Sequence, residues 1–246
     1  MQTKLKIEYQ QCAEKKSGIP VIIAAAGSSS RMGGENKQFI NICGIPVLAR
    51  TMLAFERCDV ISKIIIAAKK EDINEIQLLA EKYMITKLCD IVEGGKNRAE
   101  SIANCFKMLD ESVEKVLIHD GARPLVPDSV IKSVVSELKT SKAVTCAVPV
   151  NDTVKKVDRD GIVTETPDRS SLVAVQTPQG VWVNEYKEIL STQSDLSKFT
   201  DDMSVMEAGG YCVKTVPGSF FNFKITTPVD VFAAEGCIQR EENECE

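Results

Sequence analysis

Short runs of apolar, mostly β-branched residues alternate along the chain with segments whose apolar residues recur at helical spacing. Five such runs are typical of buried strands, at residues 21–23, 64–68, 88–92, 116–119 and 144–148. Between them, apolar residues repeat every three or four positions over 73–80 and 99–106, as on helices that face a core. Strands that alternate with helices build a parallel sheet covered by helices on both faces. The pattern therefore predicts an α/β fold.

One segment, residues 151–169, interrupts this alternation. Two short, polar, β-prone stretches flank Asp160-Gly161 in it, a sequence typical of a hairpin turn. A two-stranded hairpin alone is marginally stable in water, so we expect this arm, taken as residues 149–171, to lie against something. It folds back on its own domain or reaches another subunit. The positive charges of Lys155 and Lys156 would allow an anionic ligand to bind beneath the arm. The alternative is an arm whose charged residues are simply solvated.

The two ends of the chain carry different signals. Thr227 is placed as the N-cap of a final helix, with Pro228 at its first position and Asp230 at its third. Residues 1–19 are polar and mixed in charge, which predicts a loosely attached N-terminal extension. The chain has 246 residues, 43% of them hydrophobic, which is enough for one large core, so residues 20–240 are predicted to form a single domain.

Composition excludes several classes of protein. The net charge of −5 argues against a general nucleic-acid surface, and no apolar run approaches the ~20 residues that span a bilayer, so we expect a soluble protein that binds neither nucleic acid nor membrane. The nine cysteines occur singly, without a CxxC pair. Those in apolar segments are expected to be reduced core residues of a cytoplasmic protein: Cys58, Cys89, Cys105, Cys146 and Cys212. A single histidine, His119, argues for chemistry that needs no imidazole.

The loop after the first strand is a candidate phosphate site. The small residues from Ala24 to Gly27 let a bulky ligand lie against backbone N–H donors, and Arg31 and Lys37 add positive charge. Two familiar phosphate loops are excluded. The glycines after Gly27 do not match the dinucleotide fingerprint, and Lys37 lacks the glycine before it and the Ser/Thr after it that a Walker lysine has. The alternative is an ordinary Gly/Ser turn with solvated cations.

Two further glycine-bearing loops follow predicted strands. The sequence GGKNRAES runs from Gly94 to Ser101 and enters a helix, and HDGARP spans residues 119–124. Open α/β sheets bind ligands at the carboxyl ends of their strands. Each loop alone is most often a turn, but three of them at one edge of the sheet favour a ligand site.

Seven motifs then occur in a characteristic order: AAAGSSSRMGGENKQF, EGGKNRAESI, HDGARP, PVNDTVKK, QTPQ, TDD and NFKITTP. In this order, over residues 20 to about 240, the chain resembles the 2-C-methyl-D-erythritol 4-phosphate cytidylyltransferase family of non-mevalonate isoprenoid synthesis. Several motifs are shared with other nucleotidyltransferases, whereas the ordered set, hairpin included, is specific. The resemblance implies a Rossmann-like, mostly parallel sheet with helices on both faces and a protruding β-hairpin arm that is exchanged in a homodimer.

The resemblance also implies roles for individual residues. Arg31 and Lys37 are implied to bind the CTP phosphates, and Arg169 and Lys224 to position the methylerythritol phosphate; these four are the implied catalytic residues. The implied pocket for cytosine and ribose consists of Ala25, Ala26, Gly27, Gly95, Ser101 and Gly121. Asp120 is placed to hold either ribose or a metal-bound water. The other implied contacts to the acceptor are Arg123, Thr153 and Thr177, and exchange of the arms implies that Thr153, Arg123 and Arg169 serve the partner's active site.

The implied reaction transfers CMP from CTP to the sugar-alcohol phosphate and releases pyrophosphate. A phosphate oxygen of the acceptor attacks the α-phosphorus of CTP, and this oxygen is already ionised at neutral pH, so no general base is required. Charge compensation falls to Mg²⁺, held mainly through the CTP phosphates without protein ligands, and to the fixed cations. The small residues 24–26 and the Ser101 hydroxyl, expected to face the base, favour a pyrimidine over a purine.

Three positions depart from the usual pattern of the family. Ala24 replaces a common proline, Asn97 a frequent acidic residue, and Lys96 an acidic ribose contact of some members, which puts the ribose contact in doubt.

Two alternative functions stay open. A pentitol (ribitol) phosphate cytidylyltransferase would use the same nucleotide loops with another acceptor pocket, and a non-catalytic nucleotide-binding module would not need all four implied catalytic cations. A dinucleotide-binding dehydrogenase is weaker still, because the fingerprint glycines are missing.

Overall fold

The computed structural model describes residues 18–27 and 36–244, with burial described to residue 240. Its strands are β1 (Ile19–Ala24), β2 (Asn41–Ile42), β3 (Ile45–Pro46), β4 (Ile61–Ala68), β5 (Leu88–Glu93), β6 (Lys115–Asp120), β7 (Ala143–Pro149), β8 (Lys156–Val157), β9 (Val163–Glu165), β10 (Val173–Trp182) and β11 (Val213–Pro217). Its helices are α1 (Val47–Arg57), α2 (Ile73–Lys82), α3 (Arg98–Phe106), α4 (Asp128–Glu137), α5 (Val183–Thr192), α6 (Asp202–Ala208) and α7 (Pro228–Glu244), with 3₁₀ turns η2 (Lys70–Asp72) and η3 (Arg169–Ser171).

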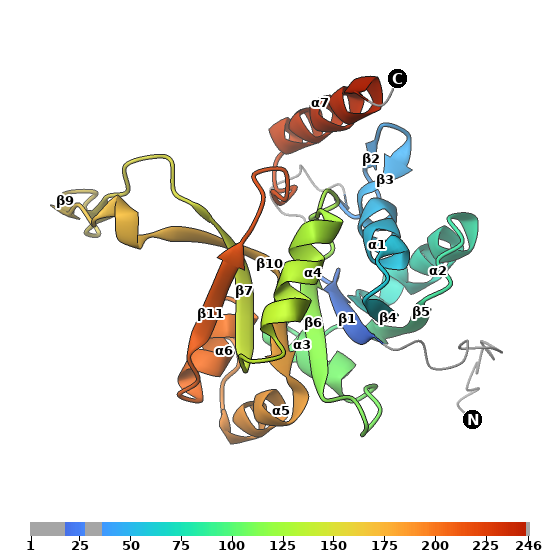
Figure 1. Ribbon diagram of the computed structural model, residues 1–246, viewed down its shortest axis with the longest axis horizontal. Coiled ribbons are helices and arrows are strands. Elements are labelled where there is room, and N and C mark those ends of the chain that lie inside the picture. The colour runs from blue at the N-terminus through green and yellow to red at the C-terminus, as the bar shows by residue number, and fades with distance from the viewer. Residues whose placement is uncertain (1–17, 28–35, 245–246) are drawn as a thin grey trace.

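A seven-stranded sheet in the order β11-β7-β10-β6-β1-β4-β5 forms the centre of the body (Figure 1). Its strands are parallel except β10, which pairs antiparallel with both neighbours. All five predicted strands are present, as β1, β4, β5, β6 and β7. The sequence did not predict β10 and β11. Pro178 interrupts the apolar pattern of β10, where the pairing with β7 also shifts, and β11 is a short edge strand with exposed residues.

Helices cover both faces of this sheet, as predicted. Val21 and Ile23 of β1 point to one face and pack in a core with apolar residues of α1, α2 and α4. Ile22, between them, points to the other face and packs with α3, α5 and α6. This alternation follows from the two-residue period of a strand, and because both faces are covered, β1 is apolar at every central position.

The final helix begins where it was predicted, and of the two residues predicted to cap it, Asp230 makes the contacts at its start. The Asp230 carboxylate accepts hydrogen bonds from the backbone N–H groups of Thr226 and Thr227, both at 2.7 Å. The Thr227 hydroxyl donates to the same carboxylate instead of capping the helix itself. Helix α7 then packs through Ala234 and Ile238 against the β2–β3 region. The predicted extension, residues 1–19, lies outside the described residues except for its last two.

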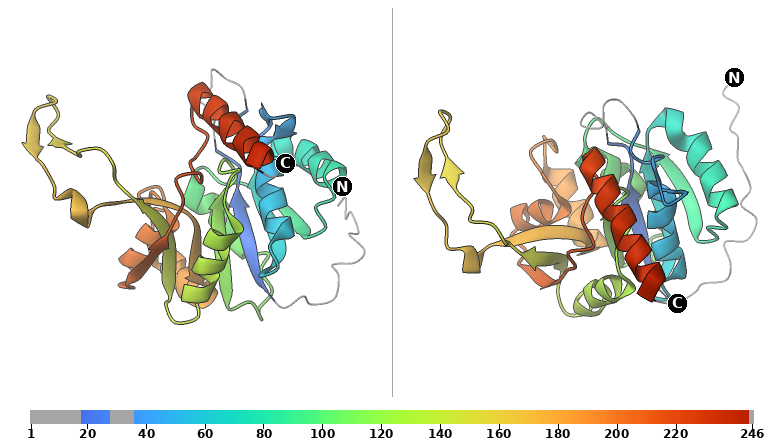
Figure 2. Two further views of the ribbon diagram at one scale, coloured as in Figure 1. Left: turned by 45° about the horizontal axis from the view of Figure 1, so that its top comes forward. Right: turned by 90° about the horizontal axis from the view of Figure 1, so that it is seen from above.

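The predicted hairpin is present as β8 and β9, and it projects from the body (Figures 1 and 2). Its turn is wider than the predicted Asp160-Gly161 pair: the Asp158 N–H donates to the Ile162 carbonyl at 3.0 Å. Gly161 has φ +80°, the left-handed region that favours glycine. All residues from 151 to 166 are exposed, so within this chain the arm does not fold back on its own domain.

The cysteines agree with the sequence interpretation in part. All seven described cysteines are free, and Cys58, Cys105 and Cys146 are buried. Cys89 is half-buried. The expectation that Cys212 is a core residue is wrong, because it lies exposed in the turn between α6 and β11. None of the helices in the described part of the chain is long and apolar enough to cross a membrane.

Candidate active site

The loops at the carboxyl ends of β1, β4, β5 and β6 meet around one cavity, called here the α3 cavity because the start of α3 forms one wall. The meeting of the three predicted glycine-bearing loops is therefore confirmed. Several cations and one carboxylate are among the described residues that line it: Ala24, Ala26, Gly27, Lys37, Gln38, Lys69, Gly95, Lys96, Asn97, Arg98, Ser101, Asp120, Ala122 and Lys224.

Two residues of the implied nucleotide pocket lie behind the wall of this cavity. Ala25 is buried, and its N–H donates to the Ala67 carbonyl at 2.7 Å, which continues the β1–β4 pairing. Gly121 donates its N–H to the Ala24 carbonyl, and a Cβ there would lie 3.0 Å from Gln38 Oε1. Neither lines the cavity, so both shape it from behind.

The turn into α3 is held by its own side chains. Asn97 caps the helix by accepting from the Glu100 N–H at 2.9 Å, and Glu100 accepts from the Lys96 N–H at 2.9 Å. The Ser101 hydroxyl donates to the Asn97 carbonyl at 2.8 Å and accepts from the Gly95 N–H at 3.0 Å. This hydroxyl therefore orients the glycine loop, and Ser101 also lines the α3 cavity, where the expected contact with the base stays a prediction.

Substitution of Gly94 by alanine is expected to raise, about tenfold or more, the KM for the nucleotide that the family resemblance implies. A Cβ on Gly94 would lie 2.5 Å from the Ala26 Cβ and 3.0 Å from the Ser101 Oγ, so the loop must move into or away from the cavity. Steady-state kinetics at varied CTP concentration measures this. The matched control is Gly236→Ala at an exposed position of α7, where the added Cβ meets no described atom outside its own helix backbone and chain neighbours within 4 Å. An unchanged KM in the Gly94 variant would contradict the assignment.

Asp120 lies at the end of β6 among three cations. Its Oδ2 is 2.9 Å from Lys224 Nζ and 3.5 Å from Arg123 Nε, and its Oδ1 is 3.4 Å from Arg98 Nε. Burial alone raises the pKa of Asp120, but Arg98, Lys224 and Arg123 outweigh burial and hold its pKa well below the usual range. The carboxylate is thus charged at neutral pH and pairs with the three cations.

A second cavity adjoins the first. It is called the β10 cavity, and its described lining residues are Arg98, Asp120, Arg123, Thr145, Val173, Val175, Gln176, Thr177, Gln179, Thr200, Asp201, Met203, Ser204, Glu207, Val213, Thr215 and Lys224. Arg98, Asp120 and Lys224 line both cavities. Of the residues implied to bind the nucleotide, Ala26, Gly27, Lys37, Gly95 and Ser101 line the α3 cavity. Two residues implied to bind the acceptor, Arg123 and Thr177, line the β10 cavity. The shared residues lie at their boundary.

The remaining predicted residues fall in three places. Arg31 lies outside the described residues. Thr153 and Arg169 are exposed on the arm and line neither cavity; Arg169 Nη1 donates to the Asn151 carbonyl at 2.7 Å. The expectation that Arg123 serves a partner's site is corrected, because Arg123 follows β6 by three residues and its guanidinium lies beside Asp120 of its own chain.

His119 and Thr177 form a buried hydrogen-bond relay behind Asp120. The His119 Nε2 lies 3.2 Å from the Arg123 carbonyl, which only accepts, so Nε2 carries the proton. Its Nδ1 then accepts from the Thr177 hydroxyl at 3.0 Å, and that hydroxyl accepts from the Asp120 N–H at 3.0 Å. Burial lowers the pKa of His119 to about 3, so the imidazole is neutral at physiological pH.

We expect the free energy of unfolding to fall by about 2 kcal/mol between pH 6.5 and pH 4.5 because of His119 alone. The pKa is about 3 in the fold and 6.5 ordinarily, so the unfolded chain binds the proton first and acid favours unfolding. Urea unfolding at the two pH values measures the fall, and His119→Gln should show a smaller one. Equal falls in the two proteins would contradict the burial of a neutral imidazole.

Arg98 is a site residue that the sequence interpretation missed. It is the first residue of α3, and its Nη2 lies 2.7 Å from Asp202 Oδ2 while its Nε faces Asp120. A signal was available in the sequence. A cation at the first position of a helix is opposed by the helix dipole, so an arginine there indicates carboxylate or phosphate partners.

A mostly parallel α/β sheet with glycine-bearing loops and cations at the carboxyl ends of its strands, and without the dinucleotide fingerprint, is typical of α/β enzymes that bind phosphate-bearing ligands at this edge, a class that includes the nucleotidyltransferases. The model of one family within this class, 2-C-methyl-D-erythritol 4-phosphate cytidylyltransferase (IspD), matches residues 19–240. The chain belongs to this family.

Individual relatives agree with this assignment. The chain is 42% identical over 224 residues to the protein of that name from Halalkalibacterium halodurans, across 90% of this chain and 97% of the relative. It is also 42% identical over 221 residues to the one from Bacillus cereus, across 89% and 97%. A crystal structure of 4-diphosphocytidyl-2C-methyl-D-erythritol synthase from Anaerococcus prevotii superposes with a TM-score of 0.80 at 32% identity, covering 92% of this chain and all (100%) of that one. The cytidylyltransferase from Thermus thermophilus gives 0.74 at 28% identity, across 90% and 99%.

Proposed function

We propose that this chain transfers CMP from CTP to 2-C-methyl-D-erythritol 4-phosphate, forming 4-diphosphocytidyl-2-C-methyl-D-erythritol and pyrophosphate. One observation carries the proposal: two adjoining cavities share a boundary of Arg98, Asp120 and Lys224. A phosphate anion that attacks a second phosphate needs two adjacent binding sites with positive charge between them. The family assignment supports the identity of both substrates.

The described residues supply the charge that this reaction needs. Lys37 lines the α3 cavity and would lie against the triphosphate, and Lys224, 37% exposed in its side chain, would meet the acceptor phosphate and the α-phosphate. Negative charge spreads over the phosphoryl oxygens in the transition state, so fixed cations stabilise it more than the ground state. A neutral, fully buried His119 with both ring nitrogens hydrogen-bonded is not available as a base, in keeping with an acceptor that is already ionised.

The residues of the α3 cavity fit a magnesium ion that arrives with the triphosphate. Asp120 is the single carboxylate among the described residues lining this cavity, and its oxygens already face three cations at 2.9 to 3.5 Å. Mg²⁺ prefers oxygen ligands, which the phosphates provide. The bound ion would offset phosphate charge, while Lys37 and Lys224 add positive charge from the protein.

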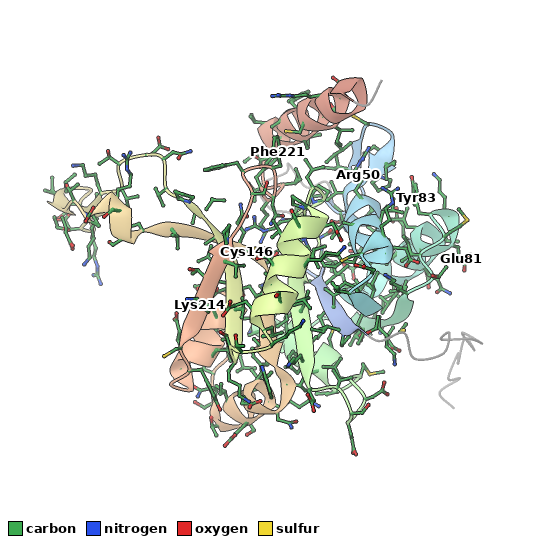
Figure 3. The ribbon with its side chains drawn as sticks, in the orientation of Figure 1. Arg50, Glu81, Tyr83, Cys146, Lys214 and Phe221 are labelled. Atoms are coloured by element: carbon green, nitrogen blue, oxygen red, sulfur yellow. The ribbon has the colours of Figure 1, made fainter. Side chains whose placement is uncertain are left out.

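We also propose a cytoplasmic homodimer in which the arm completes the partner's site. Thr153 and Arg169 belong to the exposed arm, which projects from the body in Figure 2, and neither residue lines a cavity of its own chain. At the base of the arm an apolar groove includes Val173, Phe220 and Phe221, which are 48 to 58% exposed, and Figure 3 labels Phe221 between β11 and α7. Exposed apolar side chains beside a sheet edge suit a protein interface. Free thiols at all seven described cysteines support the location.

The experiment that tests the function is pyrophosphate release by the purified protein with CTP and Mg²⁺. Methylerythritol 4-phosphate, ribitol 5-phosphate and no acceptor are compared, and release is expected with methylerythritol 4-phosphate alone. Release only with ribitol 5-phosphate would move the protein to the pentitol phosphate enzymes. CTP binding without release for any acceptor would identify a binding module and contradict the proposal.

A further inference from the structure

A chain of buried polar contacts leads from the core between α5 and α6 to the boundary of the two cavities. The Tyr186 hydroxyl donates to Asp202 Oδ1 at 2.8 Å, and Asp202 Oδ2 lies 2.7 Å from Arg98 Nη2. Arg98 Nε faces Asp120 Oδ1 at 3.4 Å, and Asp120 Oδ2 faces Lys224 Nζ at 2.9 Å. The contacts therefore connect a tyrosine behind the site to the lysine in it.

The first two residues in this series of contacts, Tyr186 and Asp202, line neither cavity. Tyr186 is fully buried, and its ring stacks on Phe106 of α3 with centroids 4.6 Å apart. Asp202 is 1% exposed, and its backbone N–H donates to Gln179 Oε1 at 3.0 Å. The Tyr186 ring and the Asp202 backbone are thus both held in place. A buried carboxylate is costly unless paired, so Asp202 and Arg98 hold each other.

The charges explain what this arrangement accomplishes. Arg98 lies between two carboxylates, so Asp202 draws one side of the guanidinium away from Asp120. Without Asp202, Arg98 would turn fully to Asp120 and compete with Lys224 for it. Lys224 would then lose the contact that sets the position of its ammonium group at the boundary of the cavities.

We propose that Asp202 and Tyr186 are positioning residues, which set Lys224 for the reaction through Arg98 and Asp120. This inference rests on the proposed function, because it explains how two residues outside the cavities influence cytidylyl transfer. It predicts energetic coupling between Asp202 and Lys224, which do not touch each other.

The test is a double-mutant cycle on kcat/KM for methylerythritol 4-phosphate. Asp202→Asn is expected to lower it about tenfold or more in the wild-type background and less than about twofold in a Lys224→Met background. Tyr186→Phe keeps the stacked ring and removes one hydroxyl, and about a three- to tenfold loss is expected. The matched control is Tyr211→Phe, since Tyr211 packs against the same core without a hydrogen bond from its hydroxyl in the described chain.

The outcomes separate the inference from the function. If the wild type transfers CMP but Tyr186→Phe matches Tyr211→Phe, the inference is overturned and the function stands. Equal losses from Asp202→Asn in both backgrounds likewise indicate a general structural role and overturn it. If Asp202→Asn does not fold, the cycle is run with Tyr186→Phe. No transfer by the wild type overturns the proposed function, and the inference with it.

Discussion

Replacing Lys224 by methionine is expected to lower kcat/KM for cytidylyl transfer by roughly 100- to 1,000-fold. Lys224 Nζ is 2.9 Å from Asp120 and lies at the boundary of the α3 and β10 cavities. Methionine keeps an unbranched apolar stem of similar length and removes only the charge. The loss should fall mainly on kcat, because the charge that Lys224 meets is greatest in the transition state.

The matched control for this variant is Lys214→Met. Lys214 is an exposed lysine of the edge strand β11, labelled in Figure 3, and it lines neither cavity. Its replacement should leave kcat/KM within about twofold of the wild type. Pyrophosphate release at subsaturating acceptor measures both variants. A loss of less than about threefold in Lys224→Met would remove this residue from the catalytic groups.

Replacing Arg169 by alanine is expected to lower kcat/KM about 100-fold, and mixing this variant with Lys224→Met should restore activity. Arg169 lies on the arm, outside the cavities that contain Lys224. If the arm completes the partner's site, a mixed dimer has one intact site and one with both substitutions. Equal mixing makes half of the dimers mixed, so about a quarter of the wild-type activity should return.

The control for the mixing experiment is an arginine of the same arm. Arg159 lies exposed at the hairpin turn, and Arg159→Ala should keep activity within about threefold. The two purified variants are unfolded and refolded together, and size-exclusion chromatography measures the dimer. Activity of the mixture no greater than the mean of its components would show that each chain uses only its own residues.

The sequence by itself determined the fold class and many of its elements, because buried strands and helices show in the spacing of apolar residues; α1, α4, α5 and α6 were not predicted. Five sheet strands, the two helices α2 and α3 and the hairpin could be predicted on this basis. The position of the nucleotide loops also followed, since parallel strands end at one edge of a sheet. The antiparallel strand β10 could not, because Pro178 interrupts its pattern and its partners are distant in sequence.

Only the tertiary structure decided how the candidate site is arranged. Arg98 meets Asp202, and Lys224 meets Asp120, across long stretches of chain, and no local spacing records such pairs. The Ser101 hydroxyl turned out to hold the Gly95 loop because the helix start brings it within hydrogen-bond reach. The residue types and motifs that bear the chemistry were thus readable from the sequence. Which of them share a cavity, and which hold one another in place, depends on sheet order and helix packing, which join residues far apart in the chain.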